Sequence, residues 1–398
     1  MVKVNARKRG QNSWQYYFDL KRVNGERKRK TKSGFKTKDE ALKAGMKAYN
    51  EYYFGNKDKD QSNMTYGELL DEWMNEQVNY SRSRQTELSY KKLIRNYVKP
   101  ELGNKLLKEI KPGDIQKLVN KMIAKKYSYN TIKNVFLTIS ASFKYAVDIQ
   151  EYLDRNPTKK ANIPNERILK QKQVNSHPNV FLQKEIIEKI FERFTEDVPQ
   201  HYLTLLFAYR CGLRSGEIFG LTWDDVDFKN HTLRIERQLQ YDTEKKEWYY
   251  TIPKYDSCRV IYLDNFTLDV LKRIKEKHDN ERKSKNFYKY YVNSSGSFTT
   301  HNHGKEVDMI IRKNDTGFAS SNIKTHIAEV IHNDLGIKEY TLHSLRHTHA
   351  TELKDAGVDS LYIAQRLGHK SLKETMKYTH TSDVNAKRSE ELINNMHS

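Results

Sequence analysis

The chain contains 398 residues, a length that favours two or three domains over one. Its 71 Lys and Arg residues outnumber its 51 Asp and Glu residues, and the net charge of +20 favours a polyanionic partner such as nucleic acid, although charge alone does not distinguish an enzyme from a basic structural protein. The chain has no apolar run near the roughly 20 residues of a membrane span and no N-terminal signal segment, so we expect a cytoplasmic protein without a membrane partner. It has only two cysteines, so no disulfide scaffold is expected.

The N-terminal segment predicts a small sheet of three strands followed by a helix. Apolar and polar residues alternate over Trp14–Leu20, the period of a half-buried strand. The dipeptide Asn24-Gly25 is typical of a two-residue hairpin turn, because both residues tolerate positive φ. A further strand is expected over Glu26–Ser33. Thr37 and Glu40 then form a capping box that opens the helix.

The strand at residues 26–33 carries a cluster of cations. They are Arg27, Lys28, Arg29, Lys30 and Lys32. A basic sheet of this size can lie in a groove of DNA, so these residues are candidate DNA contacts. The alternative is a charged strand that is simply solvated.

A helical domain is expected after a polar linker at residues 57–63. Thr65 and Glu68 form a second capping box, and a helix over Thr86–Val98 is expected to stop before Pro100. Further helices are expected from Pro112 and over Asn130–Ile149. Exposed cations on these helices are candidate contacts to the DNA backbone or ordinary surface charges: Lys91, Lys92, Arg95 and Lys133.

A second linker at residues 161–179 leads to a third domain. Helices are expected over Glu185–Phe194, Leu203–Tyr209 and Asn265–Lys277, and from Ser320 almost to the end. Three short strands are expected over Thr232–Leu239, Trp248–Ile252 and Arg259–Leu263. The region 283–315 has no clear pattern. The predicted fold class is therefore α+β and multidomain: a three-stranded sheet with a helix, an all-α domain, and a mainly α domain with a small antiparallel sheet.

The third domain also contains residues suited to phosphodiester cleavage. That reaction needs an attacking oxygen, stabilisation of charge on the phosphate, and a proton for the leaving oxygen. Arginine meets the second need because its planar fork matches phosphate oxygens and stays charged. His343 and Arg346 share one face of a helix, since they lie three residues apart. Arg214 is expected at or near a helix start and must be brought to them by the fold.

Together with the residues around it, this set resembles the signature of the tyrosine recombinases, also called phage-type integrases. The pattern is Arg, an acidic residue, Lys, His-x-x-Arg, His or Trp, and Tyr. Its positions are filled in order by Arg214, Glu217, Lys254, His343, Arg346, His369 and Tyr378. An ordered set of this length is far more specific than any single motif.

The resemblance implies a role for each of these residues. Arg214 and Arg346 would bind the scissile phosphate. His343 and His369 would add hydrogen bonds and manage the proton of the nucleophile, and Lys254 would protonate the leaving 5′-oxygen. Glu217 would orient the cluster. Tyr378 would be the nucleophile and form a 3′-phosphotyrosyl link that conserves bond energy, so neither ATP nor a metal or other cofactor is expected.

The resemblance also implies a domain plan and partners. By analogy with integrases of conjugative transposons and temperate phages, residues 1–56 would bind arm-type DNA sites. Residues 64–160 and the catalytic domain at 180–398 would clamp the core-type site. The expected assembly is a homotetramer on two paired duplexes that passes through a Holliday junction. An excisionase and a host DNA-bending protein are possible accessory partners.

Other classes of function stay open at this point. A non-catalytic DNA-binding protein would explain the charge but leaves the ordered set to coincidence. A type IB topoisomerase shares the chemistry, and a metal-dependent nuclease is a third alternative. His343, His347 and His349 have the helical spacing of metal ligands, although they lack an acidic or thiolate partner at the usual spacing. We interpret His347 and His349 as packing or surface residues of the helix.

Overall fold

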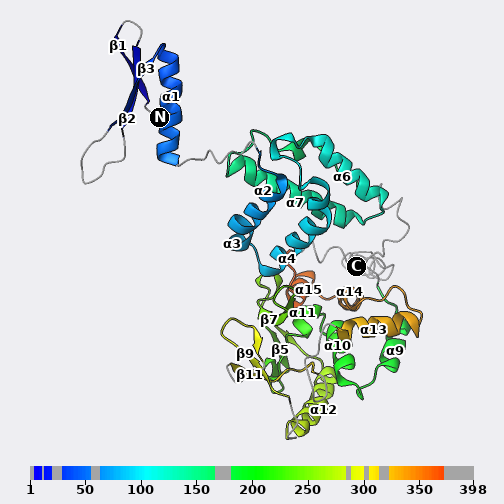
Figure 1. Cartoon of the computed structure of the whole chain (residues 1–398). Coiled ribbons are helices and arrows are strands. Elements are labelled where there is room, and N and C mark those ends of the chain that lie inside the picture. Colours follow the sequence, from blue (N-terminus) through cyan, green and yellow to red (C-terminus); the bar gives the residue numbers. More distant parts are fainter. Residues whose placement is uncertain are drawn as a thin grey trace, which may run out of the picture. The chain divides into compact units, whose positions relative to one another are not determined.

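The computed structural model describes residues 4–10, 13–19, 29–54, 63–165, 181–283, 288–299, 304–312 and 322–371 (Figure 1). The chain divides into two compact units, residues 1–169 and 170–398. The predicted fold class is confirmed, because a three-stranded antiparallel sheet is followed by an all-helical region and then by a mainly helical one with small sheets. Residues 57–62 of the first linker and residues 166–179 of the second lie outside the described ranges.

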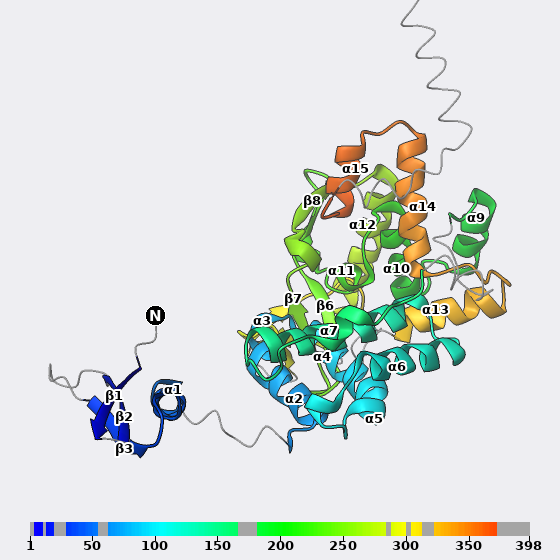
Figure 2. The same ribbon diagram turned by 90° about the horizontal axis from the view of Figure 1, so that it is seen from above.

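The N-terminal sheet is formed by β1 (Asn5–Gly10), β2 (Ser13–Asp19) and β3 (Arg29–Phe35), with β2 in the middle. Tyr16 and Phe18 are buried against α1 (Lys38–Phe54), which lies beside the sheet in Figure 2. This confirms the strand predicted from alternation. The predicted turn at Asn24-Gly25 lies outside the described residues.

The predicted N-cap of α1 is also confirmed. The Glu40 N–H donates to Thr37 Oγ1 at 3.2 Å, and the Glu40 carboxylate accepts from the Lys36 N–H at 3.0 Å. Capping of this kind satisfies backbone donors that have no partner inside the helix.

The helical region begins with the predicted capping box: the Thr65 N–H donates to Glu68 Oε2 at 2.8 Å, and the Glu68 N–H donates to Thr65 Oγ1 at 3.3 Å. Buried apolar side chains from α2, α6 and α7 form its core. The elements are α2 (Tyr66–Trp73), a π-helical turn (Met74–Val78), α3 (Asn79–Ser81), α4 (Arg84–Leu93), a second π-helical turn (Ile94–Val98), α5 (Lys99–Leu102), α6 (Pro112–Ala124) and α7 (Tyr129–Asp148). After them, residues 157–163 pack back onto the same core.

The prediction that the helix stops before Pro100 is wrong. The chain continues through the wide turn Ile94–Val98 into α5, and Pro100 occupies the first turn of α5. In a regular α-helix the proline ring clashes with the carbonyl four residues earlier. Here the Lys99 N–H donates to the Ile94 carbonyl five residues back, and this wider turn accommodates the ring.

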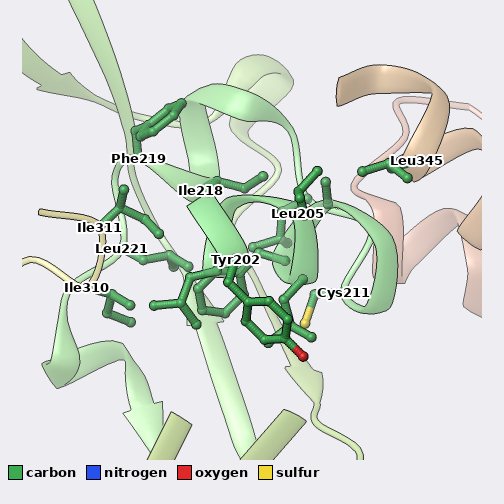
Figure 3. Close-up of a cluster of buried hydrophobic side chains, with 14 of the residues drawn as sticks. Tyr202, Leu205, Cys211, Ile218, Phe219, Leu221, Ile310, Ile311 and Leu345 are labelled. Carbon is green, nitrogen blue, oxygen red and sulfur yellow. The ribbon is translucent and has the colours of Figure 1, made fainter. Parts of the chain in front are cut away.

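The C-terminal unit places helices around small sheets. Its helices are α9 (Lys184–Arg193), α10 (Pro199–Arg210), α11 (Ser215–Ile218), α12 (Asn265–Glu281), α13 (Asn322–Asn333), α14 (Leu342–Asp355) and α15 (Ser360–Leu367). Leu205, Ile218, Leu345, Ile310 and Ile311 belong to one buried apolar core, in which Leu205 lies between Leu345 and the pair Ile310 and Ile311 (Figure 3). Across the described residues, every helix is too short or too polar to traverse a bilayer.

In the described residues of this unit, the strands form three antiparallel sheets. The first contains β4 (Val226–Asp227), β5 (Thr232–Ile235) and β8 (Arg259–Tyr262), the second β6 (Gln238–Asp242) and β7 (Glu247–Thr251), and the third β9 (Tyr290–Val292), β10 (Phe298–Thr299) and β11 (Lys305–Val307). The third sheet lies in the region that the sequence left unplaced. It joins the β6–β7 hairpin, because the Tyr250 N–H donates to the Gly296 carbonyl at 2.8 Å.

The single strand predicted over Thr232–Leu239 is two strands in different sheets. β5 pairs with β8, whereas β6 pairs with β7. The change occurs at Arg237, whose Nη1 donates to the buried carboxylate of Asp225 at 2.6 Å and to Thr222 Oγ1 at 3.1 Å. This buried polar contact holds the chain where it leaves the first sheet.

Candidate active site

Arg214 lies at the N-cap of α11, the helix start that the sequence predicted. Its Nη1 donates to Glu217 Oε1 at 2.8 Å and to Ser257 Oγ at 3.3 Å, and its Nη2 donates to the Gly368 carbonyl at 2.6 Å. The turn before it requires Gly212, which has φ 67°; a Cβ there would lie 2.6 Å from a carbon of the His349 ring. Arg214 is therefore oriented by three separate segments of the chain.

Glu217 is fully buried and holds two arginines together. Besides Arg214, it accepts from Arg259 Nη1 at 3.1 Å and from Arg259 Nη2 at 2.9 Å. Burial by itself would raise the pKa of Glu217, but hydrogen bonding and charge from Arg259, with the charges of Arg214 and Arg346, lower it to about 2. Glu217 is thus ionised at neutral pH and acts as a fixed anchor.

The sequence analysis did not identify Arg259 as a residue of the site. In the structure its side chain is only 8% exposed. Besides the two contacts to Glu217, its Nε donates to the Arg366 carbonyl at 2.7 Å. One available signal was that a buried carboxylate needs partners for both oxygens, and a single neighbouring arginine rarely supplies them all.

Arg346 is almost fully buried on α14 and connects the turn at Gly212 to the end of α15. Its Nη1 donates to the Gly212 carbonyl at 2.6 Å, and its Nη2 donates to the Leu367 carbonyl at 2.7 Å. Gly212 lies two residues before Arg214, and Leu367 lies two residues before His369. The predicted partners, far apart in sequence, are therefore brought together through backbone carbonyls that one guanidinium contacts.

His343 and His369 lie in the field of these arginines. His343 is exposed, but partial desolvation, then the charges of Arg346 and Arg214, lower its pKa. Burial, then the charges of Arg346, Arg214 and Arg259, lower the pKa of His369 to about 3. Both imidazoles are consequently neutral at pH 7 and can each donate one hydrogen bond and accept a proton.

The other two histidines of α14 are packing residues, as the sequence analysis interpreted them. The His347 ring lies 4.6 Å from that of His343, nearly perpendicular to it. His349 is buried, and its Nε2 accepts from Arg366 Nε at 3.2 Å. In the part of the chain that the structure describes, no three His, Cys, Asp or Glu side chains are grouped so as to hold a metal ion.

Lys254 lies beside this cluster in a short 3₁₀ turn between β7 and β8. Its Nζ is 5.1 Å from the centre of the Tyr255 ring, and Lys370 Nζ is 5.5 Å from the same ring. The turn therefore reaches the segment that contains His369. Tyr378, the predicted nucleophile, lies outside the described residues.

The predicted cations of the N-terminal sheet fall on different faces. Lys30 and Lys32 are exposed but oppose Phe18 and Tyr16 in register, so they lie on the side that α1 covers. Arg29 lies on the other face and pairs with Asp19 at 2.8 Å. Arg27 and Lys28 lie outside the described residues.

The open face of this sheet carries Arg29 together with two basic residues that the sequence analysis did not select, Arg7 and Arg9. Arg7 and Arg29 each lie 5.4 Å from the centre of the Tyr17 ring. Arg7 and Arg9 both donate to Gln15 Oε1, at 3.0 and 2.8 Å. The alternation of residues 4–9 was the signal that could have identified this face.

The cations predicted on the helical region lie on its surface. Lys91 forms an ion pair with Glu87 at 2.9 Å, and Lys133 Nζ lies 5.7 Å from the centre of the Tyr129 ring. Lys92 and Arg95 are exposed. These placements are compatible with contacts to a DNA backbone.

Comparison with known proteins identifies the class to which this fold and site belong. Residues 180–384 match the phage integrase family, residues 4–47 an arm DNA-binding domain, and residues 65–123 the N-terminal SAM-like domain of phage integrases. The chain belongs to the phage integrase family, the tyrosine recombinases, which cleave and rejoin DNA.

Two relatives illustrate the range of this family. The chain is 30% identical over 352 residues to a tyrosine recombinase XerC-like protein of Caldanaerobacter subterraneus subsp. tengcongensis, covering 85% of this chain and 84% of the relative. It is 26% identical over 301 residues to the transposase from transposon Tn916 of Enterococcus faecalis, covering 74% of this chain and 69% of the relative.

Solved structures share the fold. The Tn1549 transposon integrase in complex with a circular intermediate DNA aligns with a TM-score of 0.62 at 20% identity, covering 82% of this chain and 99% of that chain. A lambda integrase tetramer bound to a Holliday junction aligns with a TM-score of 0.58 at 17% identity, covering 93% and 96%. At these identities the likeness concerns the fold.

Proposed function

We propose that the chain is a site-specific DNA recombinase that integrates and excises a mobile element. The observation that carries the proposal is the cluster of Arg214, Arg346 and His369, which come from three separate segments. Each arginine donates to a backbone carbonyl of a segment that carries another member of the cluster, and Glu217 pairs with Arg214. Such a rigid cationic site suits a phosphate whose negative charge increases in the transition state.

In the proposed reaction, Arg214 and Arg346 bind the non-bridging oxygens of the scissile phosphate. The carbonyls that hold each guanidinium set its orientation, and a guanidinium has five N–H donors in all. The phenol oxygen of Tyr378 attacks the phosphorus and forms a 3′-phosphotyrosyl link. Lys254 protonates the leaving 5′-oxygen.

The proton of the Tyr378 phenol must also be removed. A phenol with a pKa near 10 is a poor nucleophile at neutral pH, so a nearby acceptor and nearby cations are needed. His343 and His369 are neutral because their pKa values are lowered, and either can accept this proton. Because the phosphotyrosyl link conserves bond energy, rejoining needs neither ATP nor a metal ion.

The DNA-binding surfaces extend this proposal to the other domains. The basic face of the N-terminal sheet, with Arg7 and Arg29, would bind arm-type sites. The helical region, through Lys91, Lys92 and Lys133, would clamp the core-type site with the catalytic domain. Four protomers would pair two duplexes through a Holliday junction, and an excisionase and a DNA-bending protein would select the direction.

A trapping experiment tests the proposal. A library of nicked duplexes with randomised core sequence is incubated with the full chain in EDTA, and adducts that resist denaturing detergent are sequenced. The wild type is expected to form a covalent 3′ adduct at a preferred sequence, whereas Tyr378→Phe binds DNA without forming it. Arg346→Lys is expected to bind but cleave poorly, because a point charge cannot replace the planar fork.

Each other outcome assigns another class. An adduct formed by Tyr378→Phe would refute the choice of nucleophile. Adducts without sequence preference would favour a type IB topoisomerase, and binding without any adduct would favour a non-catalytic DNA-binding protein. Cleavage that EDTA abolishes would favour a metal-dependent nuclease.

A further inference from the structure

The turn that carries Lys254 has an unusual backbone. Tyr255 has φ 66° and ψ 25°, and Asp256 has φ 52°, so two consecutive residues other than glycine adopt the left-handed conformation. This region is disfavoured for large side chains, and residues held in it cluster at functional sites. The left-handed backbone at Tyr255 therefore indicates a functional role for its side chain.

The Tyr255 ring is shared by two lysines. Lys254 Nζ lies 5.1 Å and Lys370 Nζ 5.5 Å from its centre, within the range of cation–π attraction. Lys370 directly follows His369. The ring is half exposed and lines a pocket of about 470 Å³ together with Ser257, Arg259, Gly368 and His369.

This turn is anchored to the phosphate-binding arginines. Ser257, two residues after Tyr255, accepts from Arg214 Nη1 at 3.3 Å, and its carbonyl accepts from Arg259 Nη1 at 3.1 Å. The aromatic ring is consequently held at a defined place beside the cluster. A lysine side chain has a long flexible stem, and an attractive aromatic face reduces the number of positions that its ammonium samples.

We propose that Tyr255 is a positioning residue for the reaction: its ring lines the pocket together with His369 and holds the Lys254 ammonium next to it. The inference rests on the proposed function, in which Lys254 is the proton donor. As the bond from the Tyr378 oxygen to phosphorus forms, the bond from phosphorus to the 5′-oxygen breaks. The proton passes from Lys254 Nζ to that oxygen and leaves a 5′-hydroxyl and a neutral amine.

A substrate whose bridging 5′-oxygen is replaced by sulfur tests the inference, because a thiolate leaves without being protonated. Tyr255→Asn removes the ring and retains a residue that tolerates the left-handed backbone. In single-turnover cleavage this variant is expected to be about two- to fivefold slower on the oxygen substrate, the factor associated with an exposed cation–π contact, and unchanged on the sulfur substrate. Tyr255→Phe retains the ring and is expected to match the wild type on both.

Two results would overturn the inference. One is an equal loss on both substrates for Tyr255→Asn, which is the result expected of a merely structural residue. The other is cleavage of the oxygen substrate at the wild-type rate by that variant.

Lys254→Ala separates the inference from the proposed function. Loss of cleavage on oxygen with recovery on sulfur supports Lys254 as the proton donor whatever Tyr255 does. Lack of recovery on sulfur would instead refute that part of the proposed function.

Discussion

Replacing Arg259 with glutamine tests the buried ion pair at the centre of the candidate site. The substitution removes a guanidinium that contacts both oxygens of Glu217, at 3.1 and 2.9 Å. The two side chains are 8% and 0% exposed, so little water can take the place of the lost contacts. Glu217 would retain Arg214 as its partner.

The size of the effect follows from the pKa of Glu217. Although burial opposes ionisation, the neighbouring arginines lower the pKa of Glu217 from 4.5 to about 2. This shift corresponds to a contribution of about 3 kcal/mol to the free energy of unfolding at pH 7. Removing one member of a buried pair typically costs about 3–5 kcal/mol. We therefore expect Arg259→Gln to lower the free energy of unfolding around α11 and β8 by about 3 kcal/mol.

The pH dependence has a definite sign. A carboxylate with a lowered folded-state pKa stabilises the fold fully above about pH 4.5, and this contribution is lost as the pH falls toward 2. In Arg259→Gln the pKa of Glu217 rises, so the loss begins at a higher pH. Between pH 7 and 5 the wild type is expected to keep the stabilisation from the ionised Glu217 carboxylate. Over the same range the variant is expected to lose part of the stabilisation that Glu217 still provides.

Hydrogen exchange of peptides from α11 and β8 in the full chain measures these local free energies. Arg273→Gln is the matched control, since Arg273 also contacts Glu196 through two nitrogens, at 3.1 and 2.6 Å, but at the surface. Its cost is expected to stay below about 1 kcal/mol. In a double-mutant cycle with Glu217→Gln, the two changes should be non-additive by about 1–3 kcal/mol. Equal costs for the two arginine variants, or strict additivity, would refute the reasoning.

Three further predictions concern other parts of the molecule. Gly212→Ala is expected to destabilise the catalytic domain by about 1–3 kcal/mol, measured by urea unfolding, because its Cβ would lie 2.6 Å from carbons of both His349 and Leu367; an unchanged midpoint would contradict this. Leu205→Ala is expected to cost about 2–5 kcal/mol in the same assay, since the side chain is fully buried, and a cost below 1 kcal/mol would argue against that core. Arg7→Ala is expected to weaken arm-site binding and to reduce the salt slope by about 1 in fluorescence anisotropy, with core-site cleavage unchanged; an unaltered slope would show that this face makes no phosphate contact.

The elements predicted correctly are those whose signals are local. The capping box at Thr65 and the alternation over Trp14–Leu20 involve neighbouring residues, so the sequence contains all the interacting groups. The helix through Pro100 was missed because the compensating π-helical turn depends on the packing of the whole helix against its neighbours. The strand over Thr232–Leu239 was not divided because Asp225, which binds Arg237, lies in another element.

The candidate site shows the same division. The ordered set from Arg214 to Tyr378 could be read from the sequence because residue types and their order are sequence properties. Arg259 could not be recognised in this way, since its role depends on facing a buried carboxylate forty-two residues away. The arginines at Arg7 and Arg29 required the register of three strands before their common face was apparent.

The sequence by itself determined the class of this protein, those secondary-structure elements whose signals are local, and the residue types of its candidate site. Only the tertiary structure decided how that site is held: Arg346 contacts the carbonyls of Gly212 and Leu367, and Glu217 joins Arg214 to Arg259. The physical reason is that a buried charge must find its partners across space. Sequence order records which groups are present, whereas the fold decides which of them can neutralise one another.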